Sequence, residues 1–192
     1  PVRVLMLAPT RELAIQVYES VKTYSRYVPI RSCCVFGGVD IKPQIAEIRC
    51  GVEVLVATPG RLLDLFEQKC LNFASVQALV LDEADRMLDM GFVPDVTRII
   101  NLLPRQRQSL LFSATFSEEI KKLADGMLKS PVLVEVAKRN TVSETITHRV
   151  HPVAAEAKRA LLIKLLKSAD FNQVLVFTRT KIEANRLARE LQ

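Results

Sequence analysis

Short apolar runs alternate along the chain with longer stretches whose apolar residues recur at helical spacing. The runs contain few polar interruptions, a pattern typical of strands buried on both faces of a parallel sheet. We therefore predict strands at 4–8, 33–36, 52–57, 78–81, 110–112, 132–136 and 174–177. The stretches between them predict helices such as 11–28, 59–68, 92–103 and 117–129. This succession predicts an α/β fold built on a mainly parallel sheet.

A polar segment at 137–147 interrupts this pattern and has no clear period of its own. We interpret it as a linker between a first domain at 1–136 and the start of a second domain at 148–192. In the second domain we predict a strand near 147–152, a helix near 154–169 and a helix that opens near Lys181. The chain reaches Gln192 inside that helix, so we expect a second α/β unit that has begun and not finished.

The composition is that of an ordinary soluble globular protein, with 49% apolar and 25% charged residues among 192. It excludes a disordered chain and a disulfide-rich scaffold. No apolar run approaches the roughly 18 residues of a membrane span. The first residues resemble no targeting signal, so we expect a cytoplasmic protein without a membrane partner.

The net charge of +6 comes entirely from the carboxyl-terminal part of the chain. Residues 1–136 hold 16 basic and 16 acidic side chains, whereas residues 137–192 hold 11 basic and 5 acidic ones. Such a basic segment favours a polyanionic partner, with nucleic acid as the first candidate. A solvated helical surface is the alternative that charge alone leaves open.

The segment Asp82-Glu83-Ala84-Asp85 follows the apolar run at 76–81. Ligands of open α/β sheets bind beyond the carboxyl ends of the strands, where these carboxylates would meet the phosphates of a nucleotide. One carboxylate can hold Mg²⁺ through water while its neighbour orients an attacking water. The structural alternative is a helix start, where acidic residues interact favourably with the helix dipole.

Three further strand exits carry helix caps, glycines or arginines. Thr10 and Arg11 follow the first strand, Gly37 and Gly38 the second, and Thr58-Pro59-Gly60-Arg61 the third. Thr10 and Thr58 can cap helices, and free amides at a helix start next to an Arg form a phosphate site. Each segment alone also fits an ordinary turn. Three of them on one sheet edge could follow a sugar–phosphate backbone without reading bases.

Two later segments each allow a structural and a functional interpretation. Ser113 and Thr115 follow the strand at 110–112 and could hydrogen-bond the carboxylate cluster, although Thr115-Phe116-Ser117-Glu118 also fits a capping box. Thr178-Arg179-Thr180 follows the strand at 174–177, and Thr180 with Glu183 fits the same capping pattern.

In this order, these segments resemble the DEAD-box family of ATP-dependent RNA helicases. The matching segments are Pro9-Thr10-Arg11-Glu12-Leu13-Ala14, Gly37-Gly38, Thr58-Pro59-Gly60-Arg61, Asp82-Glu83-Ala84-Asp85, Ser113-Ala114-Thr115 and Val176-Phe177-Thr178-Arg179-Thr180. Residues 86–92 and 110–116 also match, so the resemblance covers essentially the whole chain. The residues around 105–119 and 174–181 are similar to the bacterial RhlE-like branch.

The resemblance implies two RecA-like domains that close over ATP and RNA, the first incomplete and the second only begun. It implies Mg²⁺ on Asp82, a hydrolytic water positioned by Glu83, and an Asp85 that hydrogen-bonds Ser113 and Thr115. It also implies an RNA partner, single strand or short duplex, that is bound by its backbone without sequence preference. The residues implied in that binding are Thr10, Arg11, Gly37, Gly38, Thr58, Gly60, Arg61, Thr178 and Arg179.

One family feature, the phosphate-binding loop G-x-x-x-x-G-K-[ST], appears nowhere in the sequence. The family places this loop and its adenine-reading Q motif before Pro1, and its arginine finger beyond Gln192. We therefore expect a fragment of a longer helicase that alone neither binds ATP well nor hydrolyses it. The alternatives are an ATP-independent RNA-binding module, a decayed helicase remnant, or a related helicase or translocase that acts on DNA.

Overall fold

The structure is a computed structural model that describes residues 1–135, 147–168 and 171–191. The chain divides into two compact units, Pro1–Arg139 (unit 1) and Asn140–Gln192 (unit 2). Nearly all of the predicted linker, residues 137–146, lies outside the described residues. The domain boundaries therefore remain predictions.

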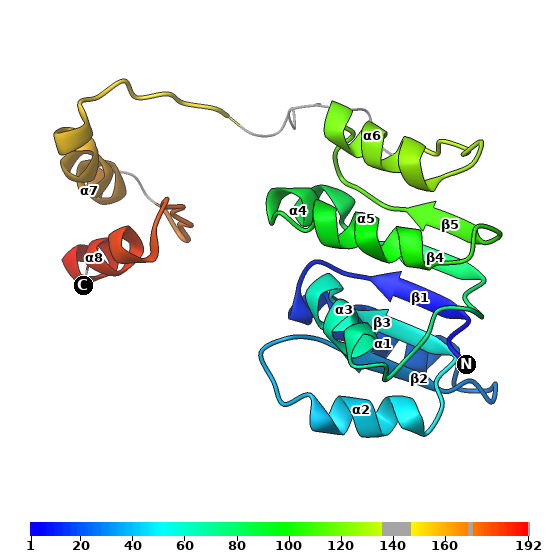
Figure 1. Ribbon diagram of the computed structural model, residues 1–192. Coiled ribbons are helices and arrows are strands. Elements are labelled where there is room, and N and C mark those ends of the chain that lie inside the picture. Colours follow the sequence, from blue (N-terminus) through cyan, green and yellow to red (C-terminus); the bar gives the residue numbers. More distant parts are fainter. Residues whose placement is uncertain (136–146, 169–170, 192) are drawn as a thin grey trace. The chain divides into compact units, whose positions relative to one another are not determined.

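Unit 1 is built on a five-stranded sheet in the order β2-β3-β1-β4-β5, and every pairing is parallel (Figure 1). The central strand β1 pairs in register with both neighbours, so that Val4 lies opposite Val54 of β3 and Ala78 of β4. The strands are β1 (Val4–Leu7), β2 (Ser32–Val35), β3 (Val54–Ala57), β4 (Ala78–Leu81) and β5 (Gln108–Leu111). Each lies within two residues of its predicted position.

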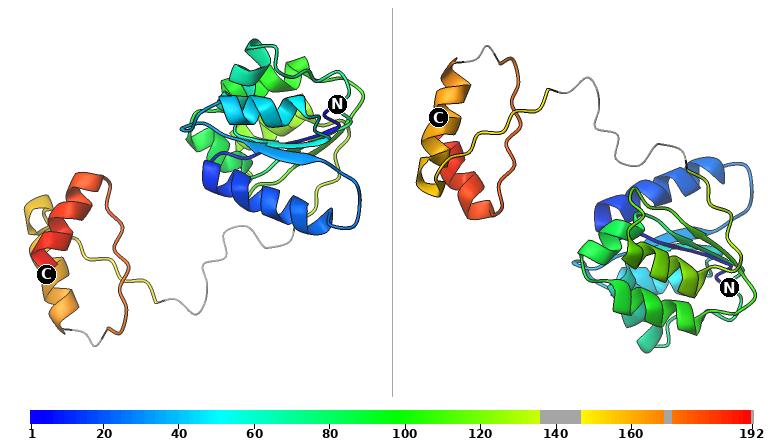
Figure 2. Two further views of the ribbon diagram at one scale, coloured as in Figure 1. Left: turned by 90° about the horizontal axis from the view of Figure 1, so that it is seen from below. Right: turned by 90° about the horizontal axis from the view of Figure 1, so that it is seen from above.

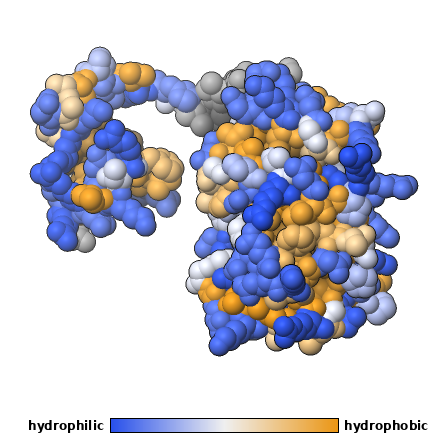
Figure 3. Space-filling view, viewed as in Figure 1, coloured by the Kyte–Doolittle hydropathy of each residue, from blue (hydrophilic) through white to orange (hydrophobic). Residues whose placement is uncertain are grey.

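Helices cover the two faces of this sheet unequally. Among the described helices of unit 1, α1 lies on one face and the others lie on the opposite face (Figure 2). A groove of about 470 Å³ runs between α5 and α6, where apolar surface is visible in Figure 3. The helices are α1 (Arg11–Tyr24), α2 (Lys42–Arg49), α3 (Pro59–Glu67), α4 (Ala84–Asp89), α5 (Val93–Leu102) and α6 (Glu118–Met127).

The sheet is fully buried on one face only. In β1 and β4, Leu5 and Leu79 are buried in the core under the larger helical layer, whereas the alternate residues Met6 and Val80 are half-buried. A helix is about 10 Å wide and strands lie about 4.8 Å apart, so α1 covers only two or three strands. The expectation of two buried faces is therefore wrong for most of the sheet, and β3 is the described strand with buried residues on both faces.

Helix α1 ends at Tyr24, four residues before its predicted end. Its start is as expected, because the Thr10 hydroxyl accepts a hydrogen bond from the Leu13 N–H at 3.3 Å. Pro29 disfavours helical backbone at Val28, which explains why the helix cannot extend to that residue. Helices α3, α5 and α6 agree with their predictions within two residues at each end.

The predicted strand at 132–136 is wrong over its described part. Residues 131–135 are extended but lie outside the sheet, and the Val132 and Val134 side chains are 87% and 77% exposed. A strand needs a neighbouring backbone that completes its hydrogen-bond ladder. Within the described ranges, no strand of the sheet pairs with residues 131–135. An apolar run therefore predicts a strand correctly only where such a partner lies beside it.

The described residues of unit 2 form a 3₁₀ turn, η1 (Ala155–Ala157), and the helices α7 (Lys158–Ser168) and α8 (Lys181–Leu191). An ion pair at 2.8 Å between Arg159 and Glu190 joins the two helices. The predicted strands at 147–152 and 174–177 are wrong, since both segments lack a pairing partner among the described residues and Phe177 is 88% exposed. In the part of the chain that the structure describes, no helix is long and apolar enough to cross a membrane.

Replacing a leucine by alanine should destabilise the protein more in the central strand β1 than in the edge strand β5. Leu7 is fully buried in β1, whereas Leu110 is half-buried in β5. We expect Leu7→Ala to lower the free energy of unfolding by about 2–5 kcal/mol, because it leaves a cavity beneath the helices. Leu110→Ala should lower the free energy of unfolding by less than half as much as Leu7→Ala. Urea denaturation measures both, and equal losses would contradict the burial described for these strands.

Candidate functional site

The carboxyl ends of all the strands meet at one edge of unit 1, because every pairing is parallel. We call this edge the carboxyl edge. The predicted site residues of unit 1 follow its strands directly or begin the helices that leave it. They are Thr10, Arg11, Gly37, Gly38, Thr58, Gly60, Arg61, Asp82, Glu83, Asp85, Ser113 and Thr115.

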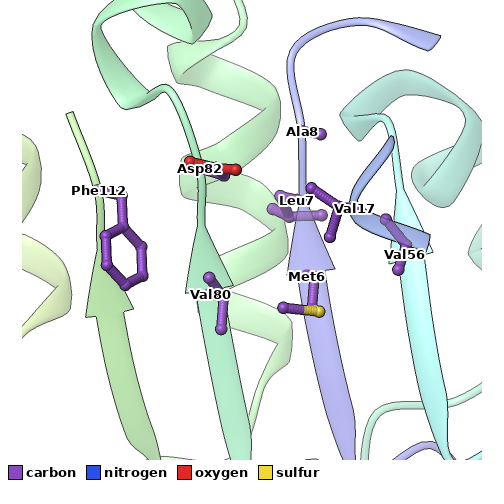
Figure 4. Close-up of a pocket in the computed structure, with 8 residues that line it drawn as sticks. All are labelled: Met6, Leu7, Ala8, Val17, Val56, Val80, Asp82 and Phe112. Carbon is purple, nitrogen blue, oxygen red and sulfur yellow. The ribbon is translucent and has the colours of Figure 1, made fainter. Parts of the chain in front are cut away.

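Asp82 directly follows β4 and lines a pocket of about 210 Å³ (Figure 4). Its Oδ1 atom accepts a hydrogen bond from the Glu83 N–H at 3.0 Å. Burial raises the pKa of Asp82 above its ordinary value of 3.8, which outweighs the opposite effect of that hydrogen bond. The other residues around the pocket are all apolar: Met6, Leu7, Ala8, Val17, Val56, Val80 and Phe112.

Glu83 has a left-handed backbone conformation, with φ 49° and ψ 54°. A residue with a β-carbon is strained there by about 1–2 kcal/mol. This conformation turns the chain sharply from β4 into α4, and the Glu83 carboxylate pairs with the Arg86 guanidinium at 3.2 Å. Strained backbone of this kind is common at functional sites.

Asp85 connects the exits of β4 and β5. Its Oδ2 atom accepts hydrogen bonds from both the N–H and the hydroxyl of Thr115, at 3.0 and 3.1 Å. The expected contact with Thr115 is therefore confirmed. The expected contact with Ser113 is wrong, since the Ser113 Oγ atom is buried and has no hydrogen-bond partner among the described residues. The capping-box alternative for Thr115 is also wrong, because Ser117 caps α6 instead.

Arg11 begins α1 and lies over the ring of Phe36, with its guanidinium carbon 5.0 Å from the ring centroid. Such a cation–π contact is worth roughly 0.5–1 kcal/mol at an exposed site. Phe36 directly precedes Gly37 and Gly38, and Gly38 has a φ of 80° that favours glycine. Arg11 thus contacts the residue that leads into the glycine pair, across the end of β3 that lies between β2 and β1.

Arg61, in the first turn of α3, is held close to the same loop. Its side chain is 10% exposed, and its Nη2 atom donates to the Val39 carbonyl at 2.9 Å. Its Nη1 atom is buried and has no hydrogen-bond partner in the part of the chain that the structure describes. Amides in the first turn of a helix lack intrahelical acceptors. The Arg61 Nε atom also pairs with the Asp64 carboxylate at 3.8 Å. The start of α3 therefore combines first-turn amides with a mostly buried guanidinium whose charge is partly balanced by Asp64.

Thr58 and Gly60 occupy their predicted positions, although one expected contact is missing. Thr58 precedes α3 and Pro59 begins it, but the Thr58 side chain makes no capping hydrogen bond. The prediction of a side-chain cap is therefore wrong, and the start of α3 relies on Pro59 for its fixed backbone angle. The space beside Gly60 is open, so another molecule can approach its backbone.

Thr178 and Arg179 belong to unit 2, where both are exposed just before α8. The Thr178 hydroxyl donates to the Thr180 carbonyl at 3.1 Å, and the Thr180 hydroxyl accepts from the Glu183 N–H at 3.2 Å. The capping interpretation of Thr180 is therefore confirmed. The RNA-binding role of Thr178 and Arg179 stays a prediction.

Sequence reasoning missed Gln44 and Arg86, which hold other site residues. Gln44, in α2, makes two hydrogen bonds to the backbone of Phe36, and Arg86 pairs with Glu83. Arg86 could have been found from its i+3 spacing to Glu83 on a helix start. Gln44 gives a weaker signal, because nothing in the sequence indicates that its amide reaches back to the end of β2.

The Asp82 carboxylate is the type of ligand that Mg²⁺ takes in proteins. Among the described residues no three metal-binding side chains cluster together. Mg²⁺ is usually held by one or two carboxylates together with water and substrate phosphates. Asp82 offers such a carboxylate, so the donor set suits a hydrated magnesium ion that arrives with a nucleotide.

We expect Asp82→Asn to stabilise unit 1 at neutral pH. The raised pKa means that the folded state binds the Asp82 proton more tightly than the unfolded state, so ionised Asp82 lowers stability. The gain in melting temperature should be largest at pH 7 and should shrink as the pH falls through the folded-state pKa. Asp89→Asn, which removes an equal charge from an exposed position, is the control. A gain that grows on acidification would contradict this prediction.

The strain at Glu83 predicts a gain in stability when the β-carbon is removed. We expect Glu83→Gly to raise the free energy of unfolding by up to about 1 kcal/mol, because glycine adopts positive φ without steric cost. Glu83→Gln keeps the β-carbon and should bring no gain. Denaturant titration of the two variants checks this, and an equal response of both would argue against backbone strain.

Comparison with known proteins agrees with the resemblance. The chain is 40% identical over 191 residues to "DEAD-box ATP-dependent RNA helicase 40" from Arabidopsis thaliana, covering 98% of this chain and 18% of that protein. It is 42% identical over 193 residues to "ATP-dependent RNA helicase DBP2" from Gibberella zeae, covering 98% of this chain and 35% of that protein. The chain thus spans about a fifth to a third of the length of these relatives.

A solved structure is also similar. The crystal structure of a hypothetical ATP-dependent RNA helicase from Sulfolobus tokodaii has a TM-score of 0.64 and 36% sequence identity, covering 67% of this chain and 39% of that chain. The parallel sheet flanked by helices is thus the RecA-like fold expected from the resemblance. The family model described as "DEAD/DEAH box helicase" matches residues 1–123. This chain belongs to the DEAD/DEAH box helicase family.

Proposed function

We propose that this chain contributes to an ATP-dependent RNA helicase, in which RNA-stimulated ATP hydrolysis drives local duplex unwinding or RNA–protein remodelling. The observation that carries the proposal is that Asp82 and Glu83 lie on the same sheet edge as Arg11 and Arg61. Carboxylates suited to nucleotide chemistry and donors suited to phosphates thus share one edge. Relatives named as ATP-dependent RNA helicases support the substrate class.

The hydrolytic part of the proposal rests on β4 and its exit. Asp82 would hold Mg²⁺ through water, and the bound ion would neutralise charge on the nucleotide phosphates. Glu83, turned out of the strand by its left-handed backbone, would orient the attacking water. The ion pair with the Arg86 guanidinium at 3.2 Å restricts where the Glu83 carboxylate can lie.

The RNA-binding part rests on the exits of β1, β2 and β3. Arg11 and Arg61 would supply positive charge, and the first-turn amides of α3 would donate to phosphate oxygens. The Nη1 atom of Arg61, which has no acceptor among the described residues, could donate to a phosphate oxygen. Contacts of this kind fix a nucleic-acid backbone without reading its sequence. Thr178 and Arg179, both exposed before α8 in unit 2, would also bind RNA.

Asp85 would connect the two parts. Its paired hydrogen bonds from Thr115 join the nucleotide end of β4 to the loop after β5. A change in the position of one loop would therefore shift the other loop.

We also propose a cytoplasmic location and, from the residues around 105–119 and 174–181, a relation to the RhlE-like branch. The relatives named above are a plant and a fungal protein.

The activity test uses the product of the whole reading frame that encodes this chain. We expect ATP hydrolysis that depends on RNA, and a loss of at least about 10²-fold with Glu83→Gln, which cannot accept a proton from water. Glu67→Gln, at the distant end of α3, controls for the loss of one acidic side chain. Undiminished hydrolysis with Glu83→Gln would disprove the assignment of Glu83.

Binding by the 192-residue chain separates the alternatives. RNA of equal length and different sequence should bind equally, with affinity that falls steeply as salt rises. Equal binding of RNA and DNA strands would instead favour a helicase or translocase that acts on DNA, since the 2′-hydroxyl distinguishes the two. RNA binding without hydrolysis by the whole reading-frame product would favour the ATP-independent module.

A further inference from the structure

The backbone of Phe36 is held by the side-chain amide of Gln44. The Phe36 N–H donates to Gln44 Oε1 at 3.2 Å, and Gln44 Nε2 donates to the Phe36 carbonyl at 3.2 Å. Gln44 is 7% exposed, which is unusual for so polar a residue. The two bonds satisfy one backbone donor and one acceptor at the point where β2 has ended.

Phe36 lies between two parts of the proposed RNA site. Its backbone leads directly into Gly37 and Gly38, and its ring lies under the Arg11 guanidinium at 5.0 Å. A shift of Phe36 would therefore move the glycine pair and Arg11 together. No β-carbon stiffens the two glycines, so the position of their loop depends on what holds its ends.

The far end of the same loop is held by a second buried side chain. Arg61 Nη2 donates to the Val39 carbonyl at 2.9 Å, and the Arg61 side chain is 10% exposed. The glycine pair thus lies between two anchored residues, Phe36 and Val39. The two anchoring side chains come from different connections: Gln44 from α2, between β2 and β3, and Arg61 from α3, between β3 and β4.

From this geometry we propose that Gln44 is a positioning residue for RNA binding, which fixes the Phe36–Val39 loop and Arg11 in the arrangement that meets the RNA backbone. The inference rests on the proposed function, since it concerns the same site. Gln44 lies behind the loop and would not touch RNA itself. Its effect would come from pre-organisation, because a loop that is already ordered loses less entropy on binding.

A purely structural role is the competing explanation. Gln44 could serve only to attach α2 to the end of β2, in which case its loss would lower stability without a specific effect on RNA. The two explanations differ in what happens to the loop while the protein stays folded. Amide hydrogen exchange of residues 36–39 reports this directly, because the Phe36 N–H is one of the bonded groups.

The test compares three variants of the 192-residue chain, each checked to be folded at the temperature of the binding assay. Gln44→Met keeps the length and volume of the side chain but can neither donate nor accept these bonds. Ile48→Val, in the same helix and 8% exposed, weakens core packing without touching the loop. Arg11→Gln removes a proposed RNA contact. The probe is a fluorescent single-stranded oligouridylate, followed by anisotropy at low salt.

We expect Gln44→Met to weaken RNA binding by about fivefold or more, equivalent to one lost hydrogen bond. Exchange of the amides at 36–39 should accelerate, while Ile48→Val should bind RNA within twofold of wild type. Unchanged binding by Gln44→Met, with weaker binding by Arg11→Gln, would overturn this inference and leave the proposed function intact. If neither Gln44→Met nor Arg11→Gln weakens binding, both the RNA site and the role of Gln44 are wrong.

Discussion

Parallel pairing around β1 is the constraint on which the rest of unit 1 depends. Because β1 is in register with β3 and with β4, Leu7 lies opposite both Ala57 and Leu81, and three strands end at one level. Residues that directly follow these strands are therefore neighbours without any need for long loops. The same pairing buries Leu5 and Leu7 between the sheet and the helices. The site residues are therefore attached to strands that are fixed by close packing.

The carboxyl edge concentrates several features that lower stability. Glu83 has a strained backbone, and Asp82 is a carboxylate in mainly apolar surroundings. Within the described ranges, the Ser113 hydroxyl and Arg61 Nη1 are buried without hydrogen-bond partners. Away from functional sites, proteins rarely leave buried polar atoms unsatisfied. The well-packed core beneath the edge offsets these costs, which is the usual division of labour between a scaffold and its site.

Much of the fold could be predicted from the sequence, because buried parallel strands are apolar and their flanking helices are periodic. The failures have local causes. The runs at 132–136 and 174–177 are apolar enough for strands, but strand formation also requires a pairing partner, which a linear pattern does not reveal. The Asp85–Thr115 bond followed from family resemblance. The hydrogen bonds between Gln44 and the Phe36 backbone were not predicted, because they depend on how α2 lies against β2. The sequence carries no signature of that tertiary contact.

Order along the carboxyl edge differs from order along the chain. The edge runs from the loop after β2 to the start of α3 and then to the start of α1, so Gly37 comes first, Gly60 second and Arg11 third. Two strand spacings of about 4.8 Å separate β2 from β1, the outer strands of this set of three. That span is close to the rise of roughly three stacked nucleotides. A ligand that lies along these three exits would therefore have a footprint on unit 1 set by the pitch of the sheet, and lengthening a loop would not enlarge it.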